Sequence, residues 1–399
     1  MNNEAYIRAG RGCCVSFSVE IDHVSSHERS VQRLPRQNEP EFSKRGVDLD
    51  KVREISEDKS HSHLIVIGRG GAVTVFRALY YSLIEEADVG VRLVTTIDPD
   101  YLQRLGRELE MEETLIYAVS SSESPIGVLE ATDFFMSKGA DLVTASSDGS
   151  ALSDYCSEAG GESLDTQDIP GRFSGLTGSG LVPLALAGID PLEVRHGAEQ
   201  MYTQVSPENQ YNPALNLASA LHSLDDQGYA EVMACIYSTR LYGFGPFIKQ
   251  LMHETVCKHQ KGQTFHAEHG PELHRHAAQR LLGGHPDVAP LFISTDTHER
   301  VEHSFDTDVD VGGNSVMSLN KQTLGDSLNA ELEAMKSEVE NLNRPSAQIE
   351  LKTLSHRSVG KLTAFLQYLA YYSALIRDVS PFTQPDIESL QRRSLDNRF

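Results

Sequence analysis

A glycine-rich turn carries one arginine just before the chain enters an apolar run. The turn is Ile169-Pro170-Gly171-Arg172-Phe173-Ser174, and the glycine-rich residues 175–180 lead from it into the apolar residues 181–187. A guanidinium held on a tight turn at the mouth of a buried helix suits an anionic substrate or a developing oxyanion. The alternative is a loop arginine that pairs with a surface carboxylate, so the surrounding residues must decide between them.

Two other turns could hold a phosphate, and each follows a predicted buried strand. Residues 68–71, which include Gly70 and Gly71, join a strand from His63 to a helix over 73–83, where free backbone N–H groups favour a phosphate or hydroxyl. The turn lacks the Lys-Ser/Thr ending of a P-loop and the dinucleotide fingerprint. Glycines that only let strand and helix approach are the alternative.

Four serines follow the predicted strand over 114–119, at positions 120, 121, 122 and 124. Hydroxyl groups at a strand-to-helix junction can wrap a phosphate together with the helix amides. An ordinary helix N-cap, which needs only one serine, is the alternative.

Titratable side chains gather in the second half of the chain. Glu254 and Lys258 lie four residues apart on a helix predicted over 245–258, a spacing that is also typical of a solvated ion pair. A histidine-rich loop is predicted next, with His266, His269, His274, His276 and His285. Its spacing matches no H-E-x-x-H helix, and no cysteine or aspartate set completes a site, so we expect no metal.

Strands and helices alternate as in a parallel α/β protein, whose functional loops lie at the carboxyl ends of the strands. Strands are predicted over 63–67, 91–97, 114–119, 140–145, 229–237 and 288–294, the fifth of which starts a second unit. Further helices are predicted over 47–58, 101–110, 207–224, 328–342 and 359–376, the last packed across both units. Residues 1 to about 45 are expected to form a polar arm, and residues 305–325 are expected to form a polar loop.

Length and composition exclude several classes of protein. At 399 residues the chain predicts two domains or one doubled α/β unit. Its net charge of −22 argues against nucleic acid or an anionic membrane as a partner. Five scattered cysteines without a C-x-x-C pair indicate a reducing compartment. Since we find neither a signal peptide nor an apolar run that could span a membrane, we expect a cytoplasmic protein.

Six stretches, taken in order, resemble the phosphoglucose isomerase (glucose-6-phosphate isomerase) family, which has the sugar-isomerase (SIS) fold. The arginine turn over 169–174 is similar to the family's G-R-F/Y-S signature, and 67–71 to its I-G-I-G-G turn. The other four stretches are residues 120–124 (the phosphate loop), 250–258 (the Q-L-W-x-E-S-x-G-K helix), 279–284 with the preceding histidines, and 380–388 (the N-P-F-D-Q-P-G-V-E tail).

The resemblance implies a fold, a reaction and a set of roles. The fold would have a first SIS subdomain over 46–200, a second over 201–345 and a C-terminal helical segment over 346–399, in a homodimer. The family interconverts glucose 6-phosphate and fructose 6-phosphate through an enediol, without a cofactor. Glu254 would be the base and acid, Arg172 would hold the enediolate, and His276, or alternatively His274, would open the ring. Substrate and phosphate would be bound by Gly70, Gly71, Ser120, Ser122, Ser124 and Gln384.

The chain departs from the family pattern around the phosphate. Ser121 replaces a lysine, Glu123 a glycine and Gly127 a glutamate, while the family's C-terminal lysine aligns with Gln391. Arg69 on the glycine turn could supply the missing charge if its guanidinium pointed into the cleft at the serines. These departures keep open a catalytically weak sugar-phosphate-binding regulatory protein, and an isomerase for another sugar phosphate is also compatible with the fold.

Overall fold

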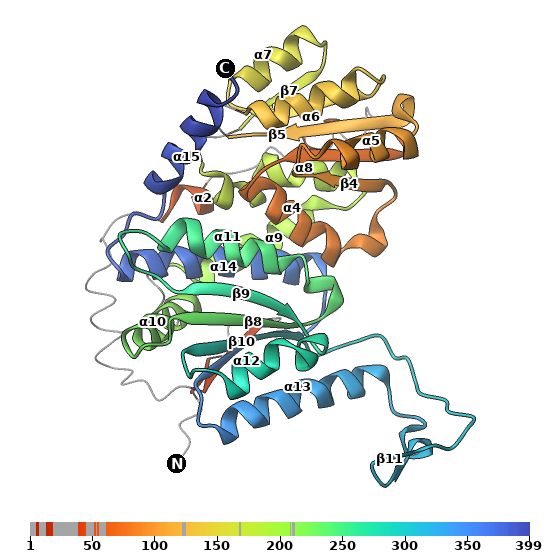
Figure 1. Cartoon of the computed structure of the whole chain (residues 1–399), viewed down its shortest axis with the longest axis vertical. Coiled ribbons are helices and arrows are strands. Elements are labelled where there is room, and N and C mark those ends of the chain that lie inside the picture. Colours follow the sequence, from red (N-terminus) through yellow and green to blue (C-terminus); the bar gives the residue numbers. More distant parts are fainter. Residues whose placement is uncertain are drawn as a thin grey trace.

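Two sheets enclose a layer of helices in the computed structural model of the chain (Figure 1). The structure describes residues 5–7, 13–18, 39–44, 52, 54–55, 61–121, 125–166, 169–207, 209 and 212–399. The helix predicted over 47–58 lies largely outside the described residues, although 52, 54 and 55 are helical. The expectation of a polar arm over residues 1 to about 45 is corrected where the structure describes it, because 5–7 and 13–18 are strands that join the second sheet.

The first sheet is parallel and has the order β4-β3-β5-β6-β7. Its strands are β3 (His63–Gly68), β4 (Gly90–Val94), β5 (Thr114–Val119), β6 (Asp141–Ser146) and β7 (Glu162–Asp165). β3 is an unbroken apolar run because both of its faces are covered. Leu64 and Val66 face the central helices, whereas Ile65 and Ile67 pack against the outer helices.

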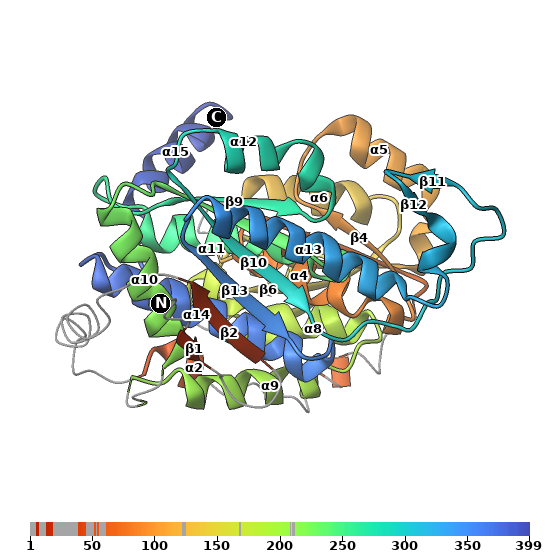
Figure 2. The same ribbon diagram turned by 90° about the horizontal axis from the view of Figure 1, so that it is seen from below.

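The second sheet has the order β1-β2-β13-β10-β8-β9. Four strands are parallel, namely β8 (Glu231–Tyr237), β9 (Thr264–His269), β10 (Val288–Thr295) and β13 (Ser346–Leu351). β2 (Cys13–Ser18) adds antiparallel to β13, and β1 (Ala5–Ile7) adds antiparallel to β2. Figure 2 shows β2 beside β13 at this side of the sheet.

Helices form three groups around the sheets. The layer between the sheets contains α4 (Gly71–Ser82), α8 (Gly178–Leu186), α9 (Pro191–Gln204), α10 (Pro213–Asp226), α11 (Phe244–Val256) and α14 (His356–Ile376). The outer face of the first sheet carries α5 (Pro99–Glu108), α6 (Ile126–Met136) and α7 (Ala151–Glu158). The outer face of the second carries α12 (Ala277–Gly283) and α13 (Leu324–Asn341). α14 is apolar on nearly every side because it is buried in the central layer.

Three expectations about local structure are corrected. Residues 264–269, expected at the start of a histidine loop, form β9, because Phe265 packs inward while polar neighbours alternate with it. Residues 346–351, expected in the C-terminal helical segment, form β13 of the second sheet. The residues predicted as a polar loop over 305–325 contain the short hairpin of β11 (Asp310–Val311) and β12 (Asn314–Ser315).

The short helix α2 (Glu41–Lys44) packs against the central layer, whereas the C-terminal helix reaches the first sheet. α2 places Phe42 face to face with Phe173 of the arginine turn, with ring centroids 4.6 Å apart. α15 (Pro385–Asp396) runs from the end of α14 toward the first sheet (Figure 1). Beyond α15, Arg398 reaches Glu130 of α6 at 2.7 Å. None of the helices in the described part of the chain is long and apolar enough to cross a bilayer.

Candidate active site

Arg172 is buried at the centre of the molecule, on the 3-10 turn η3 (Gly171–Leu176). Its Nε donates to Thr255 Oγ1 at 3.2 Å, and its Nη2 donates to the carbonyl oxygens of Pro381 at 2.7 Å and Thr383 at 3.3 Å. Burial lowers the pKa of Arg172, whereas the nearby Glu254 carboxylate raises it. A surface loop arginine would be exposed, so that alternative does not fit this residue.

Glu254 lies beside Arg172, near the end of α11. Its Oε2 is 3.6 Å from Arg172 Nη1, and its Oε1 accepts a hydrogen bond from Gln250 Nε2 at 2.7 Å. About a fifth of the Glu254 side chain is exposed (22%), so the carboxylate remains open to a small molecule. A cation and an N–H donor both favour the ionised form that a base requires.

Lys258 does not form the solvated pair with Glu254 that its spacing allowed. The lysine is 4% exposed, and its Nζ donates to the carbonyl oxygens of Thr255 and Ser380. Burial and the neighbouring Arg172 lower the pKa of Lys258 to about 8. Lys258 and Arg172 thus both hold backbone carbonyls of the segment 380–383, which precedes α15.

Gln384, a predicted substrate ligand, reaches the same place from the C-terminal segment. Its Oε1 accepts from Arg172 Nη1 at 3.5 Å. The structure therefore brings together residues from η3, α11 and the C-terminal segment. Arg172 and Gln384 lie 212 positions apart in the sequence.

The glycine turn packs directly on the arginine turn. Gly70 has a φ of 78°, a left-handed conformation that favours glycine, and a Cβ built on it would stand 3.0 Å from Gln250 Nε2. A Cβ on Gly71 would stand 2.1 Å from the backbone nitrogen of Arg172. Both predicted glycines thus lie at the site, Gly70 beside the Gln250 side chain and Gly71 against the backbone of Arg172.

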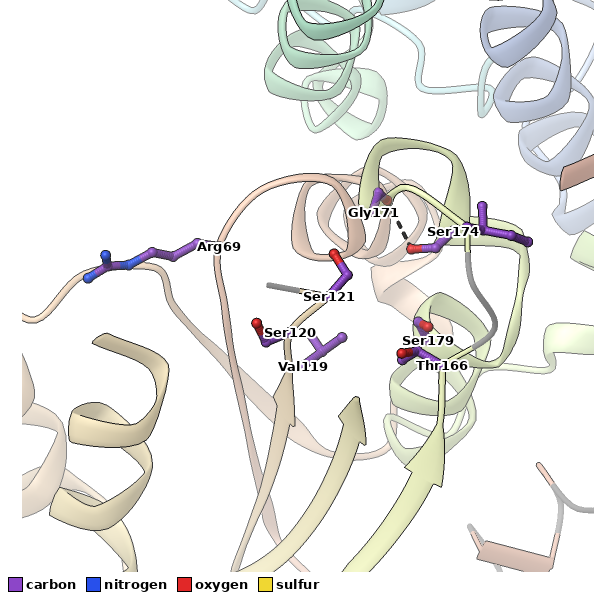
Figure 3. A pocket seen from close by; sticks show the side chains of 9 residues that line it. Arg69, Val119, Ser120, Ser121, Thr166, Gly171, Ser174 and Ser179 are labelled. Atoms are coloured by element: carbon purple, nitrogen blue, oxygen red, sulfur yellow. Dashed lines mark hydrogen bonds between the residues drawn. The ribbon is translucent and has the colours of Figure 1, made fainter. Parts of the chain in front are cut away.

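A small hydroxyl-lined pocket lies next to the arginine turn (Figure 3). Ser120 and Ser121 line it at the carboxyl end of β5, where ligands bind in parallel α/β sheets. Ser122 and Ser124 lie outside the described residues. The pocket also contains three hydroxyl residues that the sequence analysis did not select, namely Thr166, Ser174 and Ser179. Ser174 and Ser179 lie within the glycine-rich residues 169–180, so their position beside the arginine was visible in the sequence.

Arg69 lines the pocket but does not face its serines. The residue is exposed, and in Figure 3 its side chain extends away from Ser120 and Ser121. Its guanidinium lies over the first turn of α6, where a Cβ on Gly127 would stand 2.3 Å from Arg69 Nη2. The condition set for Arg69 to replace the missing lysine is therefore not met in this conformation.

The two candidate histidines lie at the other end of the second sheet. His274 Nε2 is 2.6 Å from the hydroxyl of Tyr237 at the end of β8, and its Nδ1 is 3.1 Å from Glu331 Oε2 of α13. His276 is half-exposed, with its Nδ1 3.9 Å from Glu268 Oε2. Both ring nitrogens of His274 thus have a close partner, whereas His276 is half-exposed and has only the longer contact with Glu268.

Glu254 and these histidines are separated by the length of β9. His253, next to Glu254, accepts from the backbone N–H of Phe265 near the start of β9, whereas the histidines follow its end. Six residues of strand at about 3.3 Å each span roughly 20 Å. The expectation that Glu254 lies near the His274–His276 segment is therefore wrong within a single copy of the chain.

The assembled groups suit proton transfer next to a stabilised oxyanion. A carboxylate held beside a buried guanidinium can accept a proton while the cation stabilises the charge that develops on the substrate. Within the described ranges, no group of three or more His, Cys, Asp or Glu is arranged to hold a metal ion.

Comparison with known proteins identifies relatives along most of the chain. It is 26% identical over 382 residues to a probable glucose-6-phosphate isomerase of Haloarcula marismortui, covering 91% of this chain and 85% of the relative. Among solved structures, a hypothetical protein of Thermus thermophilus matches with a TM-score of 0.82 and 24% identity, covering 93% of this chain and 94% of the other. A glucose-6-phosphate isomerase of Chlamydia trachomatis matches with a TM-score of 0.72 and 21% identity, covering 94% and 79%. No protein-family model matches the chain.

Proposed function

The chain belongs to the glucose-6-phosphate isomerase family, and we propose that it interconverts glucose 6-phosphate and fructose 6-phosphate through an enediol. One observation carries this proposal: the Glu254 carboxylate lies between the Arg172 guanidinium and the Gln250 amide, beside the glycine turn. The hydroxyl-lined pocket next to the arginine turn suits the phosphate. The proposed reaction would serve glycolysis and gluconeogenesis in the cytoplasm.

The proposed reaction moves one proton between neighbouring carbons. Glu254 removes the proton from C2 of the open-chain aldose, and the C–H electrons form the C1–C2 double bond while charge develops on O1. Arg172 stabilises that charge. O1 takes a proton from the O2 hydroxyl, Glu254 returns its proton to C1, and C2 becomes the ketone. The atoms balance without an external oxidant or reductant, and acid–base catalysis of this type typically contributes about 10²–10⁴-fold.

Ring opening needs a second proton donor and acceptor, for which His276 or His274 is proposed. Since the strand β9 separates both from Glu254 within one copy, a homodimer that lays the histidine segment of one protomer against Glu254 of the other would complete the site. His276 suits this role better, because His274 already has partners on both ring nitrogens. Analytical ultracentrifugation tests this part of the proposal, which requires a dimer.

A sugar-phosphate-binding regulatory protein is the second candidate. Ser121 stands where the family has a lysine, and the side chain of Arg69 extends away from the serines, which favours a weak phosphate site (Figure 3). The discriminating experiment couples fructose 6-phosphate conversion by the purified protein to glucose-6-phosphate dehydrogenase. Turnover that Glu254→Gln abolishes supports the isomerase. Saturable binding of fructose 6-phosphate without turnover supports the regulatory protein.

A further inference from the structure

A chain of three polar contacts leads from Thr74 of α4 through Gln250 and Glu254 to Arg172. Thr74, in the first turn of α4, has its Oγ1 2.6 Å from Gln250 Oε1. Gln250 Nε2 is 2.7 Å from Glu254 Oε1, and Glu254 Oε2 is 3.6 Å from Arg172 Nη1. We infer that Thr74 is a positioning residue, which fixes the side-chain amide of Gln250 so that its N–H donates to the carboxylate of Glu254. This inference rests on the proposed role of Glu254 as the base.

The donors and acceptors fit in only one direction. An ionised carboxylate accepts hydrogen bonds and donates none, so Glu254 requires the nitrogen end of the Gln250 amide. The oxygen end then faces Thr74, whose hydroxyl donates to it. The Thr74 hydroxyl also lies 3.1 Å from the carbonyl oxygen of Gly71, which is the weaker alternative acceptor. Without the threonine donor, only the hydrogen bond to Glu254 itself keeps the nitrogen end of the amide in place, so the Gln250 side chain is less firmly fixed.

The groups packed around Gln250 and Glu254 make the Glu254 carboxylate sensitive to the orientation of the Gln250 amide. Gln250 Nε2 packs against Gly70, so the amide is confined between the glycine turn and α11. The charged groups that face Glu254 are Arg172 from η3 and Lys258, which follows α11, with Asp386 of α15 interacting with Lys258. α4 contributes the uncharged Thr74. Loss of the Gln250 N–H would therefore leave Arg172 as the main stabiliser of the ionised Glu254 carboxylate.

Thr74→Val tests the inference, because valine keeps the shape of threonine and removes the hydroxyl. We expect kcat to fall about 10-fold, the equivalent of one hydrogen bond to a charged group. KM should change little, and the acid limb of the kcat/KM profile should move to higher pH. Thr74→Ser, which retains the donor, should restore most of the activity and the original acid limb.

Two further variants separate positioning from general damage. Thr203→Val removes an exposed helix hydroxyl, which bonds to the carbonyl of Glu199, and should leave the kinetics unchanged. Gln250→Leu removes the intermediary, so Thr74→Val should add no further loss in that background. Additive losses in the double mutant would contradict action through Gln250.

A measurement without turnover keeps this test apart from the test of the isomerase itself. The side-chain carboxyl carbon of Glu254, assigned in ¹³C-glutamate-labelled protein by comparison with Glu254→Gln, reports the titration directly. An inactive wild type would reject the isomerase, yet the Glu254 titration should still move to higher pH in Thr74→Val. An unchanged titration midpoint, or an active Thr74→Val enzyme with wild-type kcat and pH profile, would overturn the inference.

Discussion

Gly71 lies so close to Arg172 that the glycine turn and the arginine turn form one unit. A Cβ on Gly71 would stand 2.1 Å from the backbone nitrogen and 2.2 Å from the Cα of Arg172. The obstructing atoms are backbone, so no side-chain rotation can relieve the clash.

Gly71→Ala should therefore displace Arg172 and destabilise the fold. We expect the free energy of unfolding to fall by about 1–3 kcal/mol, the usual cost of overpacking, and activity to fall with it. Urea unfolding and kcat measure the two effects. Gly178→Ala is the matched control, because its Cβ would meet no heavy atom within 4 Å. Equal stability of the two variants would show that the turn moves freely away from Arg172.

Arg172→Ala should remove most of the turnover while the protein stays folded. Its charge matters most when the enediolate forms, and loss of such a donor typically lowers kcat by about 10²–10³-fold. The carbonyls of Pro381 and Thr383 also lose their donor, so hydrogen exchange across α15 should become faster. Near-normal turnover would assign Arg172 to a purely structural role.

Lys258 gives the stability of the protein a pH dependence of known sign. Its pKa is lowered to about 8 by burial and Arg172, whereas an unfolded lysine keeps its proton up to about pH 10. Between these values the unfolded chain binds more protons, so this group makes the free energy of unfolding rise with pH.

Urea unfolding of wild type and Lys258→Met between pH 8 and about pH 10 checks that sign. The wild type should gain stability relative to the mutant as the pH rises, since other titrating groups are common to both. Lys138→Met, which removes an exposed lysine, should run parallel to the wild type. A Lys258→Met curve that also runs parallel would contradict the lowered pKa.

Much of the site could be predicted because its sequence signals are steric and local. Gly70 is favoured by its left-handed φ of 78°, and Gly71 is required by its contact with the Arg172 backbone, so both positions mark the turn in the sequence. The arginine turn and α11 are also found at the positions that the sequence motifs predicted. The burial of Lys258, by contrast, depends on the carbonyl of Ser380, which is 122 residues away.

Two parts of the fold escaped prediction for identifiable reasons. β13 alternates buried Ala347, Ile349 and Leu351 with polar residues, a strand signal masked by the expectation of a helical C-terminal segment. The separation of His276 from Glu254 follows from β9, which runs between them and which was expected to form part of a loop. The Thr74–Gln250 contact likewise joins residues 176 positions apart.

Proton exchange at the substrate tests the role of Glu254 most directly. Fructose 6-phosphate is incubated with the enzyme in heavy water, and deuterium at C1 of fructose 6-phosphate and C2 of glucose 6-phosphate is followed by NMR. Glu254→Gln keeps the shape and removes the basicity, so it should abolish wash-in and spare substrate binding. Wash-in by the wild type that disappears in Glu254→Gln is the expected result. Unchanged wash-in in the mutant would reject Glu254 as the base, and none in the wild type would favour the sugar-phosphate-binding protein.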